Sequence, residues 1–365
     1  MVDKESIKLS PKQEINSADD EKRKYKRLLA KRAVFLAGCA LLLFVVAGVA
    51  LALGSANMSF LDAYAAVLGR IFPDWFAVSS LADTVVWNLR LPRILLAIFA
   101  GAALAMGGTT TQAILRNPIA TPYTLGVSAG AGLGAAIGII LGKGLMAGKL
   151  LIVSNAFVFS LIPVFVVLLL VKRRGASPET MILAGVAMVY IFNACTTILQ
   201  YFAETNAVSA TVFWVVGDLS RADWWQLPYI LGVLVFCILV NLRLSWDINV
   251  IKMGDDTAKS LGTEVDRTRI ITLVMACLAT ATVVSFTGAI GFICLVAPHI
   301  CRAIVGGDQR FLIISSSLTG AILLLLADIL ARRLIAPIIL PVGAITAFLG
   351  GPLLLYLLIR WRKNN

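Results

Sequence analysis

The stretch "IITLVMACLATATVVSFTGAIGFICLVAPHIC", residues 270–301, contains no Lys, Arg, Asp or Glu. A single α-helix of that length would measure about 48 Å at about 1.5 Å per residue, whereas the hydrocarbon core of a bilayer is only about 30 Å thick. The sequence "TGAIG" at 287–291 supplies a natural break. We therefore interpret the stretch as two membrane-spanning helices joined by a short turn.

Similar apolar runs recur along the whole chain, which is 59% hydrophobic and 14% charged. A soluble domain would carry about a quarter charged residues. The pattern predicts an all-α polytopic membrane protein with ten spans, near residues 33–53, 93–115, 122–142, 149–171, 180–202, 227–245, 269–286, 288–305, 311–335 and 338–359. Glycines spaced by four along 126–142 predict a close helix–helix contact.

The distribution of basic residues predicts the orientation of these spans. An even number of spans places both termini on one side of the membrane, and Lys and Arg cluster in residues 22–32, 172–174, 243–269 and 360–363. Such clusters favour the cytoplasmic side, so both termini are predicted to be cytoplasmic. We expect a disordered basic tail over residues 1–32 and one transmembrane domain over 33–362. The net charge of +12 is then explained by cytoplasmic loops and does not indicate nucleic-acid binding.

Four arginines depart from this rule, because the predicted topology places them outside: Arg90, Arg93, Arg332 and Arg333. They could be anchors at the level of the lipid headgroups. The interpretation that we favour is a cationic rim that an acidic partner binds from outside.

The loop 246–268 is the one substantial cytoplasmic segment. Its part "DDTAKSLGTEV" predicts a short helix that ends near a glycine. The helix is either an inert cover or a docking element for a soluble partner, and its candidate residues are Gly254, Asp255, Asp256, Ala258, Leu261 and Gly262.

Several polar side chains lie within the predicted spans. They suit either a wet transport pathway or hydrogen bonds between helices, and the candidates for pathway lining are Gln112, Asn193, Thr197 and Gln200. Asp328 lies four residues before Arg332, so the two can pair on one helix face. An intramembrane carboxylate is also a candidate transport group.

The sequence offers little for catalysis or metal binding. His299 lies near Cys294 and Cys301, but the helical period turns it about 160° from Cys301. We predict no metal site, no cofactor and no catalytic residue. There is also no phosphate-binding loop of the G-x-x-x-x-G-K-[ST] type, so the chain is not expected to hydrolyse nucleotide by itself.

Four stretches together resemble the FecCD-type permeases of ABC importers for iron–siderophore complexes, haem and cobalamin. They are "RLPRILLAIFAGAALAMGGTTTQAILRNPIATPYTLGVSAGAGLG" (90–134), "NVIKMGDDTAKSLGTEVDRTR" (249–269), "GAIGFICLVAPHICR" (288–302) and "LADILARRLIAPIILPVGAITAFLGGPLLLYLL" (326–358). The resemblance extends from about residue 33 to the end. Cys294 replaces a usual glycine, Thr121 stands where an acidic residue is common, and Arg333 doubles a usual single arginine.

The resemblance implies a permease subunit in the cytoplasmic membrane of a prokaryote. It implies a homodimer or pseudo-dimer, two cytoplasmic ATP-binding subunits and an extracytoplasmic substrate-binding protein. Arg90 and Arg332, and less clearly Arg93, match arginines that accept acidic residues of the binding protein, and residues 255–262 match the coupling helix for the ATPase. The cargo implied is a metal chelate such as a ferric siderophore, or cobalamin or haem. The alternative is an ion-coupled secondary transporter that uses Asp328.

Overall fold

The computed structural model describes residues 11–53, 59–70, 72, 75 and 78–363. Within these residues every regular element is helical, and seven helices are long and apolar enough to cross a bilayer. Three shorter apolar helices, Val127–Leu141, Ile293–Val305 and Val342–Tyr356, bring the candidate spans to ten. The predicted all-α, multi-span architecture is confirmed. The cytoplasmic placement of both termini stays a prediction.

The ten apolar segments correspond to α1 (Pro11–Ala52), α4 (Leu91–Ile114), α5 (Val127–Leu141), α6 (Leu151–Arg174), α7 (Pro178–Tyr201), α9 (Leu227–Arg243), α12 (Val265–Thr287), α13 (Ile293–Val305), α14 (Gln309–Arg333) and α15 (Val342–Lys363). Five short helices connect them: α2 (Phe60–Leu68), α3 (Ser80–Val85), α8 (Thr205–Val215), α10 (Ser245–Ile251) and α11 (Asp255–Ser260). Of these five, only α11 was predicted from the sequence. The segment formed by α3, a π-helical turn at Val86–Arg90 and α4 is continuous over 35 residues, so this span begins earlier than expected.

Helix α1 also begins earlier than expected. We predicted a disordered tail over residues 1–32, but the structure is helical from Pro11 onward, and residues 1–10 lie outside the described part. Proline is favoured at the first helical position. The sequence from 12 to 32 contains neither Gly nor Pro and is rich in Lys, Arg, Glu, Leu and Ala, which are good helix formers. These propensities extend the first span far beyond its apolar part.

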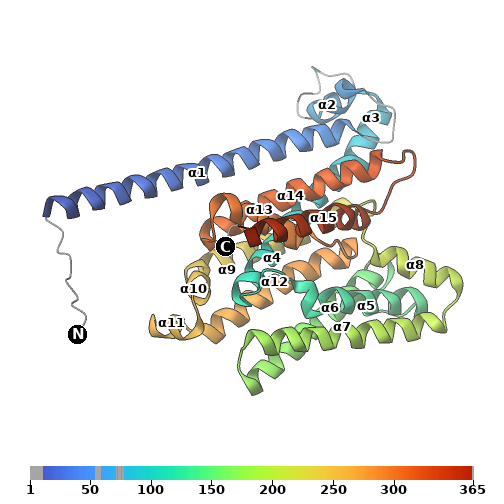
Figure 1. The fold of residues 1–365 in the computed structure, drawn as a ribbon. Coiled ribbons are helices and arrows are strands. Elements are labelled where there is room, and N and C mark those ends of the chain that lie inside the picture. The colour runs from blue at the N-terminus through green and yellow to red at the C-terminus, as the bar shows by residue number, and fades with distance from the viewer. Residues whose placement is uncertain (1–10, 54–58, 71, 73–74, 76–77, 364–365) are drawn as a thin grey trace.

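Helix α4 occupies the centre of the bundle. In an apolar stretch of 18 residues within its span, 83% of the residues are buried. The corresponding share is 17% in α1 and in α7, and these two helices lie on opposite sides of the bundle in Figure 1. Small residues allow the central contacts. A Cβ on Gly101 would clash with the Gly320 carbonyl of α14. The predicted close contact of α5 is found against α6, where Gly130 and Gly134 meet backbone carbonyls.

The short connecting helices gather at the two ends of the bundle. Helices α10 and α11 lie at the end where α1 begins, whereas α2 and α3 lie at the end where the apolar part of α1 stops (Figure 1). Each end therefore presents a different set of connecting segments to possible partners.

Candidate functional site

A cavity of about 450 Å³ lies between α5, α7 and α8. Three of the four predicted pathway residues, Asn193, Thr197 and Gln200, line it together from one face of α7. Ser128 of α5 and Thr196 add hydroxyl groups to the lining. The remaining lining residues are Tyr123, Ala129, Gly132, Val189, Val212, Val215 and Val216. The lining is thus polar and apolar but carries no charged side chain.

The local structure of α7 explains why this face suits a wet cavity. Ser177 caps the helix by accepting a hydrogen bond from the Thr180 backbone N–H at 3.2 Å. The hydroxyl of Thr197 donates to the Asn193 carbonyl at 3.0 Å, and that of Thr196 to the Phe192 carbonyl at 2.9 Å. These hydroxyls are satisfied within the helix. The amides of Asn193 and Gln200 are the groups best able to contact a passing solute.

The fourth predicted residue, Gln112, lies elsewhere. Its side chain is 3% exposed in α4 and accepts a hydrogen bond from Arg302 Nη2 at 2.8 Å. Its amide nitrogen donates to the Cys294 carbonyl at 3.4 Å. Gln112 therefore joins α4 to α13 and does not line the cavity.

The predicted cytoplasmic helix is present as α11. It starts with Asp255 and Asp256, and the backbone turns at Gly262, whose φ is +81°. Its residue Ala258 is fully buried against Ile251 and Val265, so it holds the helix down and is not part of an exposed surface.

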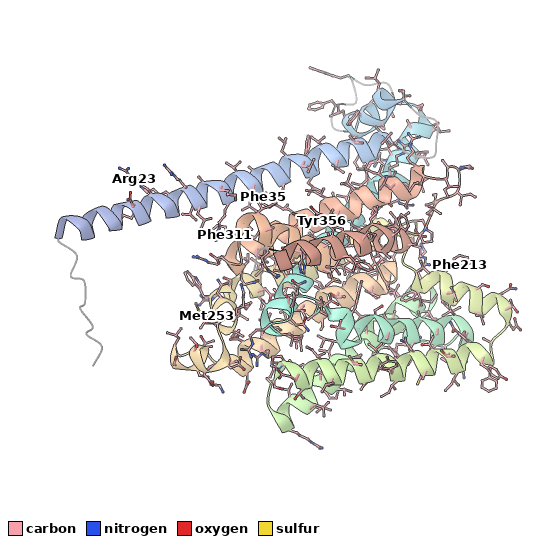
Figure 2. The ribbon with its side chains drawn as sticks, viewed as in Figure 1. Arg23, Phe35, Phe213, Met253, Phe311 and Tyr356 are labelled. Carbon is pink, nitrogen blue, oxygen red and sulfur yellow. The ribbon has the colours of Figure 1, made fainter. Side chains whose placement is uncertain are left out.

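The exposed groups of this segment lie around the buried contact, in α11 and on either side of it. Leu261, just after α11, is 65% exposed, and Met253, which precedes it and is labelled in Figure 2, is 73% exposed. Asp256 and Lys259 are also exposed. This surface mixes apolar and charged groups, as a docking element for a soluble partner would.

An arginine fastens α11 to the bundle. Arg269 of α12 is fully buried and donates to both carboxylate oxygens of Asp255, at 2.8 and 3.2 Å. It also donates to the carbonyl of Ile114, the last residue of α4, and to that of Ala176, just after α6. Arg116 forms a further ion pair with Asp255 at 3.3 Å.

These contacts stabilise the charged form of Asp255. The hydrogen bond from Arg269 is the main reason that its pKa lies below the ordinary value. Sequence reasoning counted Arg269 only as a loop charge. Its position at the start of a highly apolar span was the available signal that it would be buried.

A second charged cluster joins α1, α10 and α14 at the same end. Asp308 accepts hydrogen bonds from Arg310 at 2.7 Å, Asn249 at 2.9 Å and Arg32 at 3.2 Å. Burial acts to raise the pKa of Asp308, but the hydrogen bonds from Arg310 and Asn249 outweigh it and lower the pKa to about 2. The cluster ties the loop that leads into α11 to the first helix.

The predicted outer arginines are buried rather than exposed. Arg90, Arg93 and Arg332 are 5%, 7% and 5% exposed. Arg90 donates to the carbonyls of Leu51 and Ala52 at 2.6 and 3.0 Å, and Arg332 donates to the Leu53 carbonyl at 2.8 Å. The last carbonyls of a helix have no partner within the helix, and these arginines supply it for α1.

The expectation of an exposed cationic rim at these three positions is therefore wrong, because the guanidinium groups point into the bundle. Arg333 is the exposed arginine of this set. The docking role of Arg90, Arg93 and Arg332 stays a prediction.

Asp328 lies between two of the arginines. Its carboxylate is fully buried, 2.7 Å from Arg93 Nε and 3.0 Å from Arg332 Nε. The predicted pair with Arg332 is confirmed, whereas the pair with Arg93, 235 residues away in the chain, was missed. This carboxylate is engaged in two ion pairs within the bundle, and it is not among the residues that line the cavity. Both findings disfavour the ion-coupled alternative.

Comparison with known proteins identifies the family to which this helical bundle belongs. The model of the FecCD transport family matches residues 40–360, most of the chain. The chain belongs to the FecCD transport family. The resemblance drawn from the four sequence stretches is thereby confirmed.

FecCD relatives match over most of their length. An ABC transporter permease protein of Methanocaldococcus jannaschii is 42% identical, covering 94% of this chain and 99% of that protein. The hemin transport system permease protein of Yersinia pestis is 34% identical, covering 90% and 96%. The cobalamin import system permease protein of Halobacterium salinarum is 38% identical, covering 78% and 76%.

The FecCD fold is matched by a solved structure described as an inward-facing conformation of a metal-chelate type ABC transporter. That structure superposes with a TM-score of 0.78 at 28% identity, covering 89% of this chain and 98% of its own. Together with the ten apolar helices, these relatives make the chain a multi-pass permease of the prokaryotic cytoplasmic membrane. The FecCD family is a transport family and not an enzyme family.

Proposed function

We propose that this FecCD chain is the translocating subunit of an ATP-driven importer whose cargo is a metal chelate: a ferric siderophore, haem or cobalamin. The uncharged polar lining of the cavity between α5, α7 and α8 carries the proposal. The hemin and cobalamin relatives and the metal-chelate type transporter support the same class of cargo.

The lining favours a chelated metal over a bare metal ion. A bare divalent or trivalent cation needs several carboxylate, imidazole or thiolate ligands. The cavity offers only hydroxyl and amide groups, and the described residues contain no group of three or more His, Cys, Asp or Glu that could hold a metal. A chelate already carries its own ligands. Weak contacts with Asn193, Thr197 and Gln200 would let it pass without being trapped.

The proposed assembly follows from the two ends and the outer face of the bundle. A second copy of the chain would face α7, whose exposed residues include Leu183, Tyr190 and Ile198. Two ATP-binding subunits would seat against α11. A substrate-binding protein would dock at the opposite end, where Arg90, Arg93 and Arg332 are buried; these would support docking by positioning the end of α1 rather than by direct ion pairing.

Uptake by the reconstituted complex tests the proposal. We expect ATP-dependent accumulation of a radiolabelled ferric siderophore, haem or cobalamin in proteoliposomes that hold the permease, its ATPase and its binding protein. Asn193→Leu should slow uptake while leaving binding-protein docking unchanged. Ile191→Leu, at a 52% exposed position of the same helix outside the lining, is the matched control.

Three results would count against the proposal. Equal uptake of unchelated ferric iron would remove the chelate specificity. Uptake driven by an ion gradient without ATP would support the secondary-transporter alternative. Equal effects of Asn193→Leu and Ile191→Leu would show that the cavity is not on the pathway.

A further inference from the structure

Helix α1 is longer than a membrane span requires. Its 42 residues measure about 63 Å at about 1.5 Å per residue, about twice the hydrocarbon thickness. Figure 1 shows its N-terminal part extending beyond the other helices, at the end where α10 and α11 lie. The family model begins at residue 40, so residues 11–39 of α1 lie outside the stretch that it matches.

One face of α1 is committed to the bundle. Arg32 donates to the Val305 carbonyl at 3.0 Å and to Asp308 at 3.2 Å. Seven residues later, Cys39 lies 3.9 Å from the Thr319 hydroxyl and is buried. Residues seven apart share a helix face. Arg32 and Cys39 therefore mark the side of α1 that packs on α13 and α14.

The opposite face continues from apolar to basic along the helix. Val34 and Leu41 are 72% and 66% exposed and lie on the lipid-facing side of the span. At about 100° per residue, Arg27 and Arg23 fall within about 20° to 40° of that same line. Arg23, which Figure 2 labels on the projecting part, is about 180° from Arg32. The exposed stripe that meets lipid tails thus runs directly into exposed cations.

The composition of this part is strongly one-sided. Residues 22–32 hold seven Lys or Arg and no Asp or Glu. Arg23, Lys26, Arg27 and Lys31 are all exposed, and we call these four side chains the basic face.

We propose that the basic face of α1 binds the anionic headgroups of membrane phospholipids. Its residues lie between about 4 and 16 Å beyond Val34 along the helix axis at about 1.5 Å per residue. Most of this interval lies within the headgroup layer or within about one Debye length of it. A soluble ATPase seated on α11 would meet the bundle side of the extension, whereas the basic face is turned toward lipid.

Lipid selectivity of the full-length permease in a mixed bilayer tests this. Spin-labelled phosphatidylglycerol and phosphatidylcholine would be compared for motional restriction at the protein surface, in wild type and in the double variant Lys26→Gln with Arg27→Gln. Each basic residue near an anionic surface contributes about fivefold in binding, equivalent to about 1 kcal/mol. We expect the preference for phosphatidylglycerol to fall at least about fivefold in the double variant and to weaken with salt in wild type.

The control removes two exposed cations from the opposite end of the bundle, with Lys143→Gln and Lys149→Gln. The proposal requires that this variant lose less selectivity than the α1 variant. Circular dichroism of both variants shows whether the total helix content is unchanged. Unchanged selectivity in the α1 variant would overturn the proposal. If the same variant instead weakened association with the ATPase subunit, the basic face would belong to a protein interface.

Discussion

Neutralising Asp255 should release α11 from the bundle. Asp255 accepts hydrogen bonds from Arg269 at 2.8 and 3.2 Å and pairs with Arg116 at 3.3 Å. Asp255→Asn keeps the size of the side chain but removes its charge and leaves a single acceptor oxygen. Hydrogen bonds to charged groups contribute about 1.5–3 kcal/mol. Because the Asp255 side chain is 29% exposed, and Arg269 keeps two backbone acceptors, we take about 2 kcal/mol as the net loss for α11.

A loss of that size should increase the opening of α11 about 30-fold. Hydrogen exchange of the backbone amides in residues 255–260 measures this directly, and tryptic cleavage after the exposed Lys259 gives a second readout. Asp256→Asn is the matched control, because it makes the same substitution at an exposed neighbour on the same helix. Equal protection of α11 in the two variants would refute the argument that Asp255 fastens the helix.

The pH dependence of this protection follows from the lowered pKa of Asp255. A carboxylate whose pKa is depressed by folding contributes stability above its unfolded pKa of about 3.9 and loses it as the pH falls through the folded pKa. Protection of α11 in wild type should therefore be constant near neutral pH and should fall below about pH 4. In Asp255→Asn this acid-dependent part should be missing.

Three further predictions concern the stability of the bundle, each measured by thermal unfolding of the purified permease. Asp328→Asn should destabilise by about 3 kcal/mol or more, because it leaves two buried arginines without their carboxylate, whereas Arg333→Gln at an exposed position should have little effect. Gly101→Ala should lower the melting temperature, because its Cβ meets the Gly320 carbonyl; Gly232→Ala, with open space around its Cβ, is the control. The melting temperatures of wild type and Asp308→Asn should differ at neutral pH and converge as the pH falls from about 4 toward 2, since the pKa of Asp308 is lowered to about 2.

The sequence was most informative where hydrophobic length decided the structure. The uncharged run 270–301 was divided correctly, and the turn between α12 and α13 begins at Gly288, whose φ is +73°. The helix over 255–260 was also found, because its acidic start and Gly262 are local signals. Three cavity residues could be found because Asn193, Thr197 and Gln200 share a face of one helix at regular spacing.

Charged residues were interpreted less well, because their roles depend on distant partners. Arg90 and Arg332 were placed on the surface by a topology rule that cannot show whether a helix end needs donors. The burial of Arg269 depends on carbonyls 93 and 155 residues away. Gln112 looked like the other polar span residues, yet Arg302 holds it between two helices. The extension of α1 was missed because a polar stretch of mixed charge was taken as a sign of disorder.

The attachment of α1 to α14 has a consequence for the order of biogenesis. The hydrogen-bonding partners of Arg32 and Cys39 lie 273 to 280 residues later in the chain, and Arg332 reaches back 279 residues to Leu53. At about 5–20 residues per second, a ribosome needs roughly 14 to 55 s to make the partner of Arg32 after Arg32 itself. During that interval α1 has only its early contacts with α2, α4 and the turn at Val86–Arg90, where Arg90 bonds the Leu51 and Ala52 carbonyls. Its mean hydropathy of 2.8 is the highest among the seven long spans of the described chain, and it favours retention of the helix in the bilayer during that interval. The first helix to enter the membrane is thus among the last to be fixed along its whole length, and a nascent chain that stops before α13 leaves Arg32 and Cys39 without their partners.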